Sequence, residues 1–248
     1  QEDEAVYGGD YIIELKEKLA STGDDVLEIG KQAAVLVMSD YIKPTIEDGM
    51  RIEFDAWTSE RALVESGIVD RAIEILKSQG RTFEEEGAIW LRTTEFGDDK
   101  DRVLIKALGG NTYFASECGH ILSKIEQGFS TIIEIWGADH HGYTSRFEAA
   151  ARALGFTGEI KFLLMQLVKL MKDGEEVKMS KRAGNVVTMD ELLERVGHDV
   201  TRFFFLQYSP DTHMTFDLGI AEERSQKNPV FYVQYAHARM ASILEKGI

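Results

Sequence analysis

Cysteine is nearly absent from this chain of 248 residues, which contains only Cys118. A single cysteine excludes a framework of internal disulfides and fits a protein of a reducing compartment. No apolar run approaches the length needed to cross a bilayer, and the segment Gln1–Glu4 has neither the basic start nor the apolar core of a signal peptide. We therefore expect a cytoplasmic protein with no membrane partner.

Positive charge is scarce as well. The chain has 28 Lys and Arg residues against 43 Asp and Glu residues, a formal net charge of −15 at pH 7. Because such a surface repels the phosphates of a nucleic acid, contact with RNA requires a local basic patch or regions outside these residues. The composition thus argues against a stand-alone RNA-binding module, and a hydrophobic content of 44% argues against disorder.

The first hundred residues mix helical and strand patterns. Residues 1–50 carry helical apolar stripes, and residues 51–57 alternate between polar and apolar side chains as a half-buried strand does. Two short amphipathic helices come next, followed by strand-like pieces at 81–83, 88–92 and 102–107. This alternation is typical of an insertion within an α/β enzyme.

From Gly109 onward, strands and helices alternate regularly. Parallel strands joined by crossover helices place ligand sites at the carboxyl ends of the strands. The elements expected here are a helix from Asn111 or Thr112 to about Gln127, a strand at 130–136, a helix at 142–154 and a strand at 160–168. Those expected after them are helices at 189–196, 200–208, 221–226 and 229–246, with residues 212–216 irregular.

Three segments with chemically reactive side chains follow strand ends in this pattern. They begin at Tyr113, at Gly137 and at Lys178. We therefore expect all three to converge on one edge of one sheet. A fourth polar stretch, Asp98 to Asp101, could bind a cation, but Lys100 and Arg102 interleave with its acids, so a self-paired turn is the favoured interpretation.

The segment V-K-M-S-K-R-A-G-N, residues 177–185, gathers three cations and a hydroxyl. An Asp-Gly turn at Asp173–Gly174 precedes it and predicts a hairpin that leads into a loop. Lysine ammonium groups on a glycine-bearing loop suit a polyphosphate, which such a loop can cover when substrate binds. The alternative interpretation is a solvated basic turn.

The K-M-S-K motif at 178–181 resembles the second signature of class I aminoacyl-tRNA synthetases. Its flanks strengthen the resemblance and are similar to one member of the class, the arginyl-tRNA synthetases, over most of the chain from about Phe54. The similar segments are Y-F-A-S at 113–116, G-D-D-K-D-R-V-L-I at 97–105, G-A-D-H-H-G-Y at 137–143, R-F-F-F-L at 202–206 and N-P-V-F-Y-V-Q-Y-A-H-A-R at 228–239.

The resemblance implies an α/β fold, namely the second half of a Rossmann-like, doubly wound parallel sheet with an inserted α+β segment and a helical carboxyl-terminal extension. It divides the chain into three parts. These are a helical lead-in with the insertion at 1–108, the nucleotide-binding second half with the K-M-S-K loop at 109–226, and the start of a helical anticodon-binding domain at 227–248.

The resemblance also implies an ATP site. Asp139, beyond the strand-end residue Gly137, would bind the ATP ribose, with His140 and His141 near adenine or the amino acid. Met179 and Arg182 would contact ATP on the loop, and the catalytic residues would be Lys178, Ser180 and Lys181. Without the resemblance, a strand-end cap is the favoured interpretation of 137–141. The adjacent histidines lack zinc-ligand spacing, and no protein-bound metal site is expected.

Arginine itself is assigned to the helix that begins at Tyr113. Tyr113 and Glu117 are spaced i, i+4, and an aromatic ring beside a carboxylate suits a guanidinium. The resemblance implies that these two residues, with His140, bind the arginine substrate, although the family usually has aspartate where this chain has Glu117. The alternative interpretation of the pair is an amphipathic helix with a solvated acid.

The implied activity is that of an arginine–tRNA ligase. The arginine carboxylate attacks ATP, which arrives with Mg²⁺, and the tRNA(Arg) hydroxyl then attacks the adenylate. No protein nucleophile is needed, and no G-x-S-x-G, Walker or G-x-G-x-x-G motif occurs. The first class signature, His-x-Gly-His, is also absent, its nearest match being C-G-H at 118–120. We therefore expect this chain alone to bind ATP poorly and not to aminoacylate.

Two other functions stay open. A non-catalytic paralogue could retain an arginine pocket as a binding or regulatory module, and a related ligase could join an amino acid to an acceptor other than tRNA. The intact K-M-S-K motif disfavours the paralogue, because nothing would hold unused lysines in place. Tyr113 and Glu117 favour arginine over another amino acid.

Overall fold

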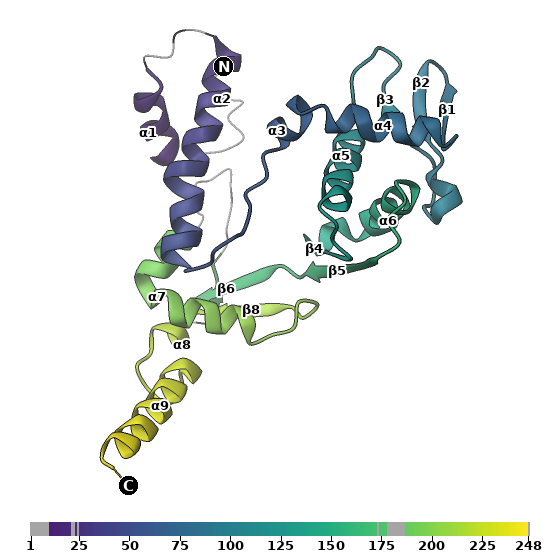
Figure 1. Ribbon diagram of the computed structural model, residues 1–248. Coiled ribbons are helices and arrows are strands. Elements are labelled where there is room, and N and C mark those ends of the chain that lie inside the picture. Colours follow the sequence, from purple (N-terminus) through teal and green to yellow (C-terminus); the bar gives the residue numbers. More distant parts are fainter. Residues whose placement is uncertain (1–9, 21–22, 24, 173, 178–186, 248) are drawn as a thin grey trace. The chain divides into compact units, whose positions relative to one another are not determined.

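The chain folds into two compact units, which are described separately. The computed structural model (Figure 1) describes residues 10–20, 23, 25–172, 174–177 and 187–247. One unit comprises Asp55–Leu167 with Pro210–Thr212, and the other comprises Gln1–Phe54, Val168–Ser209 and His213–Ile248. None of the helices in the described part of the chain is long and apolar enough to cross a bilayer.

An antiparallel sheet and a helix pair form the first part of the Asp55–Leu167 unit. Helices α3 (Glu60–Glu65) and α4 (Ile68–Ser78) precede the sheet, whose strands pair in the order β1-β2-β3. Gly80 ends the α4 turn with a φ of +70°, a conformation that favours glycine. The strands are β1 (Thr82–Glu85), β2 (Ala88–Leu91) and β3 (Arg102–Ile105), with the short 3₁₀ helix η4 (Thr93–Phe96) between β2 and β3.

A parallel β-α-β unit forms the second part. Helix α5 (Tyr113–Glu126) leads to β4 (Thr131–Gly137), then to the 3₁₀ helix η5 (Ala138–Tyr143), α6 (Thr144–Ala153) and β5 (Glu159–Met165). Strands β4 and β5 pair in parallel from Thr131 opposite Glu159 to Gly137 opposite Met165. Alternate strand residues face the helices and join one core. That core includes Ile132, Trp136, Ile160 and Phe162 from the strands with Phe114, Ile121, Phe147 and Ala150 from the helices.

The other unit packs helices against a small mixed sheet. Its sheet has the order β7-β6-β8, with β6 (Val168–Lys172) antiparallel to β7 (Glu175–Glu176) and parallel to β8 (Met214–Asp217). Phe216 is fully buried at the centre of this core, where the rings of Phe204 and Phe205 contact it. The helical segments are α1 (Asp10–Lys18), α2 (Val26–Leu36), η2 (Val37–Ile42), η3 (Thr45–Gly49), α7 (Met189–Leu206), α8 (Leu218–Glu222) and α9 (Pro229–Glu245).

Helix boundaries follow the capping residues. Thr112 accepts a hydrogen bond from the Ala115 N–H at the start of α5, and Asn228 caps α9 with Pro229 in the first turn. Thr188 and Glu191 form a capping box at the start of α7. The predicted helices in these places are confirmed, and so is the predicted hairpin, since β6 and β7 pair across residues 173 and 174.

Four predictions of secondary structure are wrong. The helix predicted at 221–226 is one of them, because α8 ends at Glu222 and residues 223–226 are not helical. Residues 51–57 form no strand, since no strand among the described residues pairs with them. The stretch 212–216 is not irregular, because most of it lies in β8, which pairs with β6. The single strand predicted at 160–168 ends at Met165, and Val168 begins β6 in the other unit.

Candidate functional site

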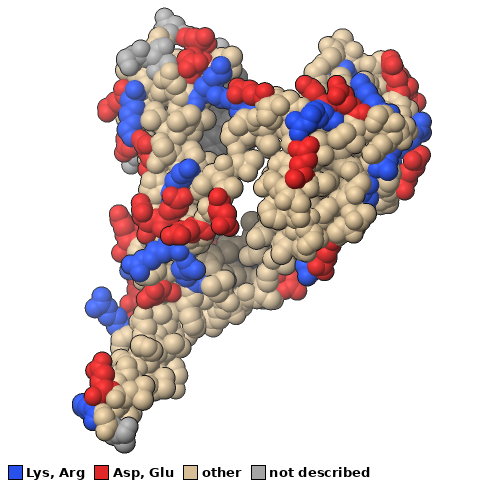
Figure 2. Space-filling view, in the orientation of Figure 1, with Lys and Arg blue, Asp and Glu red and all other residues tan. Residues whose placement is uncertain are grey.

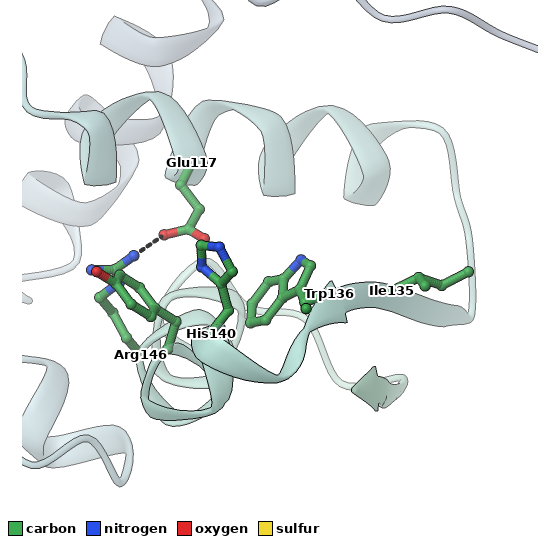
Figure 3. Close-up of a pocket in the computed structure, with 7 residues that line it drawn as sticks. Glu117, Ile135, Trp136, His140 and Arg146 are labelled. Carbon is green, nitrogen blue, oxygen red and sulfur yellow. Dashed lines mark ion pairs between the residues drawn. The ribbon is translucent and has the colours of Figure 1, made fainter. Parts of the chain in front are cut away.

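A pocket of about 490 Å³ opens between α5 and the end of β4 in the Asp55–Leu167 unit. Its volume and mixed lining are typical of sites for small ligands. Figure 3 shows Glu117 reaching from α5 toward Arg146, with His140 and Trp136 beside it. The lining residues are Glu117, Ile135, Trp136, Gly137, His140, Tyr143 and Arg146.

Close helix packing fixes the position of Glu117. Its neighbour Cys118 is fully buried in the core, where burial raises the pKa of the thiol and keeps it neutral. Gly119 lies against α4, and a Cβ at this position would lie 3.0 Å from the Val69 Cα and 2.8 Å from its Cγ2. A larger side chain would therefore push α5 away from α4. The C-G sequence after Glu117 is thus explained by packing.

Glu117 and Arg146 form an ion pair without a good hydrogen bond. The Arg146 Nη2 lies 3.5 Å from the Glu117 Oε2, and the two side chains retain 23% and 21% exposure for Glu117 and Arg146, respectively. Charge-assisted N–H···O bonds are normally 2.7 to 2.9 Å long. The Glu117 Oε2 and the Arg146 Nε are both buried and have no hydrogen-bond partner. The pair therefore has unused hydrogen-bonding capacity inside the pocket.

Aromatic rings hold the Arg146 guanidinium instead. Its Cζ lies 4.0 Å from the centroid of the Tyr143 ring and 5.5 Å from that of the Phe114 ring. A planar guanidinium stacks well on such faces. Tyr143 in turn contacts the His140 ring, with centroids 5.3 Å apart. The pocket therefore already contains one guanidinium bound by a ring and a carboxylate.

The electrostatics of the pocket oppose ionisation of Glu117. Burial raises the pKa of Glu117 above its ordinary value, the Arg146 guanidinium opposes that rise, and the nearby Glu134 carboxylate adds to it. Lys124, which forms a close ion pair with Glu134, also favours the ionised form. On the same helix, burial and then Lys124 lower the pKa of His120.

The strand-end segment after β4 lies at the edge of this pocket. Gly137 and His140 line it, whereas the Asp139 side chain is 82% exposed and lies 3.7 Å from the His140 Nε2. His141 is also exposed, and its carbonyl accepts a hydrogen bond from the Thr144 hydroxyl. The predicted segment is thus brought together with Glu117, while Asp139 and His141 extend into solvent.

Tyr113 lies outside this pocket. It is 90% exposed and lines a neighbouring pocket of about 640 Å³, together with Asn111 and Ser116. Arg146 lines both pockets. Tyr113 and Glu117 lie on one helix, as their spacing predicts, but they line different pockets.

The prediction that the three segments converge on one edge of one sheet is wrong. Tyr113 follows β3 of the antiparallel sheet, Gly137 ends β4 of the parallel sheet, and the cationic loop follows β7 of a third sheet. Glu117 and Gly137 still meet because α5 packs beside α6 and over β4. The predicted residues Lys178, Met179, Ser180, Lys181 and Arg182 lie outside the described residues.

The acidic turn is self-paired, as predicted. The Arg102 guanidinium donates to both Asp98 oxygens at 2.8 and 2.9 Å and to Asp99 at 2.5 Å. Asp101 accepts hydrogen bonds from the Thr94 N–H and hydroxyl. In the described part of the chain, no three His, Cys, Asp or Glu side chains are grouped so that they could hold a metal ion.

Comparison with known proteins decides the family. Residues 17–204 match the family described as "tRNA synthetases class I (R), catalytic domain". The chain belongs to this family. It is 44% identical to the arginine–tRNA ligase of Shouchella clausii over 99% of its own length, and 46% identical to that of Geobacillus kaustophilus over 97%. It spans 46% and 45% of those two relatives, respectively.

Solved structures agree with the family. A Campylobacter jejuni protein described as an arginyl-tRNA synthetase aligns with a TM-score of 0.84 and 35% identity, covering 97% of this chain and 54% of that one. The arginyl-tRNA synthetase of Thermus thermophilus aligns with a TM-score of 0.61 over 94% of this chain and 50% of its own. At 18% identity, the second match shows the fold alone. The predicted α/β class with a parallel sheet is confirmed.

In this member of the class I (R) family, sequence reasoning missed four pocket residues, Ile135, Trp136, Tyr143 and Arg146. A signal for two of them was present. Tyr143 and Arg146 are spaced i, i+3 at the start of a predicted helix, a spacing that brings a cation onto a ring. Trp136 carried no distinguishing signal, because a large apolar residue at a strand end is also typical of a core position.

Proposed function

We propose that this chain is part of the catalytic domain of an arginine–tRNA ligase. The full-length protein would join arginine to ATP to form arginyl-adenylate and would then transfer arginine to tRNA(Arg). The observation that carries the proposal is the Glu117 pocket, which combines a buried carboxylate with aromatic rings in a member of the class I (R) family. A guanidinium matches both features.

Recognition of arginine is assigned to Glu117, Tyr113 and His140. The Glu117 carboxylate would accept N–H bonds from the substrate guanidinium, and His140 lines the same pocket. Tyr113 is exposed and lines the neighbouring pocket, which it shares with Arg146, so its ring would approach the substrate from there. Glutamate is one methylene longer than the aspartate usual in arginyl-tRNA synthetases. The additional length would be accommodated beside Arg146, where Glu117 is partly buried.

ATP is assigned to the strand-end segment and the cationic loop. Asp139 is exposed beyond Gly137, where its carboxylate could accept hydrogen bonds from both ribose hydroxyls. His140 and His141 would lie near adenine or the amino acid. Met179 and Arg182 complete the proposed ATP contacts from the loop. Mg²⁺ would arrive bound to the ATP phosphate oxygens, which needs no separate protein site.

The chemistry requires charge stabilisation more than covalent catalysis. An oxygen of the arginine carboxylate forms a bond to the α-phosphorus of ATP, and the bond to pyrophosphate breaks. The terminal tRNA hydroxyl then attacks the carbonyl carbon of the adenylate, and AMP leaves. Lys178 and Lys181, assisted by Ser180, would stabilise the charge on the α-phosphate and pyrophosphate in the first step.

The tRNA partner would be bound mainly by regions outside these residues. On the face shown in Figure 2, Lys and Arg side chains are scattered among Asp and Glu side chains and form no broad basic field. The net charge of −15 also disfavours a large tRNA contact through these residues.

The proposal is tested by aminoacylation with the full-length protein, purified and supplied with ATP, Mg²⁺ and tRNA(Arg). We expect it to attach labelled arginine to the tRNA and to leave lysine unattached. Formation of an aminoacyl-tRNA with another amino acid, or of none with arginine, would contradict the proposed function.

Substitution Lys181→Ala in the same protein tests the role of the loop. Loss of a charge worth a few kcal/mol in the transition state should slow adenylate formation about 100-fold. The rate is measured as arginine-dependent ATP–pyrophosphate exchange with tRNA(Arg) present. Lys172→Ala is the matched control, because Lys172 is exposed at the end of β6. Unchanged exchange in Lys181→Ala would remove this lysine from the mechanism.

A further inference from the structure

The Glu117–Arg146 pair is unusual because two opposite charges lie close together without satisfying one another. Nη2 and Oε2 are 3.5 Å apart, while the Arg146 Nε donates to nothing and the Glu117 Oε2 accepts nothing. Buried polar groups in native proteins are almost always hydrogen-bonded, so an exception requires an explanation. Both orphan atoms belong to side chains that line the pocket.

The position of Arg146 is set by the rings and not by Glu117. Its guanidinium rests 4.0 Å from the Tyr143 centroid, and α6 holds it there through its own first turn. A guanidinium docked in this way supplies positive charge to the carboxylate but leaves its Oε2 without a hydrogen bond. The unused acceptor of Glu117 thus stays available to a ligand that brings its own N–H donors.

We propose that Arg146 is the positioning residue for Glu117, holding its carboxylate ionised and aimed into the pocket while leaving its oxygens free to accept hydrogen bonds from a guanidinium ligand. This inference rests on the proposed function and deepens it. It assigns a role to a residue of α6 that does not itself bind the substrate. The fixed cation also explains how a carboxylate can stay charged in a partly buried, aromatic pocket.

The charges that act on Glu117 come from each element packed around it. Arg146 on α6 and Lys124 on α5 favour its ionised form, whereas burial and Glu134 on β4 oppose it. His140 on η5 also lines the pocket and is titratable. Removing Arg146 deletes a favourable charge, so the pKa of Glu117 should rise further, and the ionised carboxylate should be lost at a higher pH.

The test is the pH dependence of L-arginine binding to the full-length protein, measured by isothermal titration calorimetry from pH 5.5 to 8.5. In Arg146→Met, the acid limb of binding should move up by about one pH unit, as expected for loss of a charge at this distance. The affinity at the wild-type midpoint should therefore fall about 5-fold, and further below it, with the two proteins converging at the alkaline end. Arg146→Lys, which retains the charge, should restore most of the wild-type profile.

Two controls separate the causes. Arg71→Met removes an arginine that pairs with Glu126, an exposed carboxylate of the same helix α5, and should leave the profile unchanged. Glu117→Gln removes the acid limb that Glu117 contributes. If Arg146→Met does not fold, as judged by thermal unfolding, Arg146→Gln takes its place. An equal loss of affinity at every pH, or no loss, would overturn the positioning role.

A second readout does not depend on arginine binding. Because a raised pKa makes the native state less stable as the pH rises through it, the difference in thermal stability between the wild type and Arg146→Met should grow over that pH range and keep its full size above it. If the wild type binds no arginine but this stability difference appears, the proposed function fails and the effect of Arg146 on Glu117 stands. If arginine binds and neither readout shifts, only the inference about Arg146 fails.

Discussion

Two carboxylate–guanidinium pairs in the Asp55–Leu167 unit differ in nearly every physical respect. Asp98 is fully buried, and Arg102 donates to both of its oxygens. The Asp99 N–H and the Ser145 hydroxyl donate to it as well. Glu117 is partly exposed in a pocket, and its nearest cation forms no hydrogen bond of normal length.

The pKa values shift in opposite directions. Burial acts to raise the pKa of Asp98, but the hydrogen bonds from Arg102 and Asp99 outweigh it and lower the pKa to about 2. Burial also raises the pKa of Glu117, and Arg146 does not fully offset it. A pair whose hydrogen bonds are all formed stabilises the fold. A carboxylate with an unused acceptor can still accept a hydrogen bond from a ligand. On this difference we base the proposal that Glu117 belongs to a ligand site, whereas Asp98 stabilises the fold.

Neutralising Asp98 should have the largest effect on stability. Asp98→Asn keeps the shape of the side chain but removes a charge that accepts several hydrogen bonds, at a cost of about 2 kcal/mol. Urea denaturation of the full-length protein measures the change. Asp99→Asn is the matched control, because Asp99 contacts the same guanidinium but is 71% exposed, and it should cost well under 1 kcal/mol. Equal losses of stability in both variants would show that the buried and the exposed carboxylate contribute alike.

Acid should remove the contribution of the ionised Asp98 side chain to the stability of the fold. Its folded-state pKa of about 2 lies below the ordinary value of 3.8, so its contribution is complete above about pH 4 and is lost as the pH falls toward 2. The stability gap between wild type and Asp98→Asn should therefore close over this range. A gap that stays constant from pH 5 to 2 would mean that the ionised carboxylate is not its source.

Neutralising Glu117 should have a smaller effect of the opposite sign. Because the pKa of Glu117 is raised, its ionised form is less favourable in the native state than in the unfolded state. Glu117→Gln should thus leave stability unchanged or increase it by at most about 1 kcal/mol. The same urea denaturation measures it. A clear loss of stability would place Glu117 with Asp98 as a structural acid.

The smallest effect is expected from an exposed pair. Arg71 donates from Nη2 to both carboxylate oxygens of Glu126 at 2.7 and 2.8 Å, yet both side chains are nearly half exposed. Short distances alone contribute little where water screens the charges, so Arg71→Met should cost about 0.5 kcal/mol. A loss as large as that of Asp98→Asn would show that distance, and not burial, decides the contribution.

Local sequence signals predicted much of the fold. The Thr112 cap, the strand at 131–137, the 173–174 turn and the self-paired Asp98 turn all depend on residues close together in the chain. Contacts between distant segments could not be predicted. Strand β8 exists because β6, more than 40 residues earlier, provides its partner.

The candidate site was predicted only in part, because some of its contacts also join distant segments of the chain. The family resemblance drew attention to Glu117 and to the segment from Gly137 to His141, and the structure places Glu117, Gly137 and His140 around one pocket. Tyr113 and Glu117 line different pockets, and Arg146 of α6, which pairs with Glu117, lines both. Helical spacing within one element cannot reveal a side chain that enters from another.

The most direct test of the central claim is calorimetric titration of the full-length protein at pH 7.5 with L-arginine and with L-citrulline, its neutral isostere. If the Glu117 pocket binds a guanidinium, the wild type should bind arginine at least 100-fold more tightly than citrulline, and Glu117→Gln should lose most of that preference without losing stability. Equal affinity for the two ligands, or a preference that survives Glu117→Gln, would contradict the account.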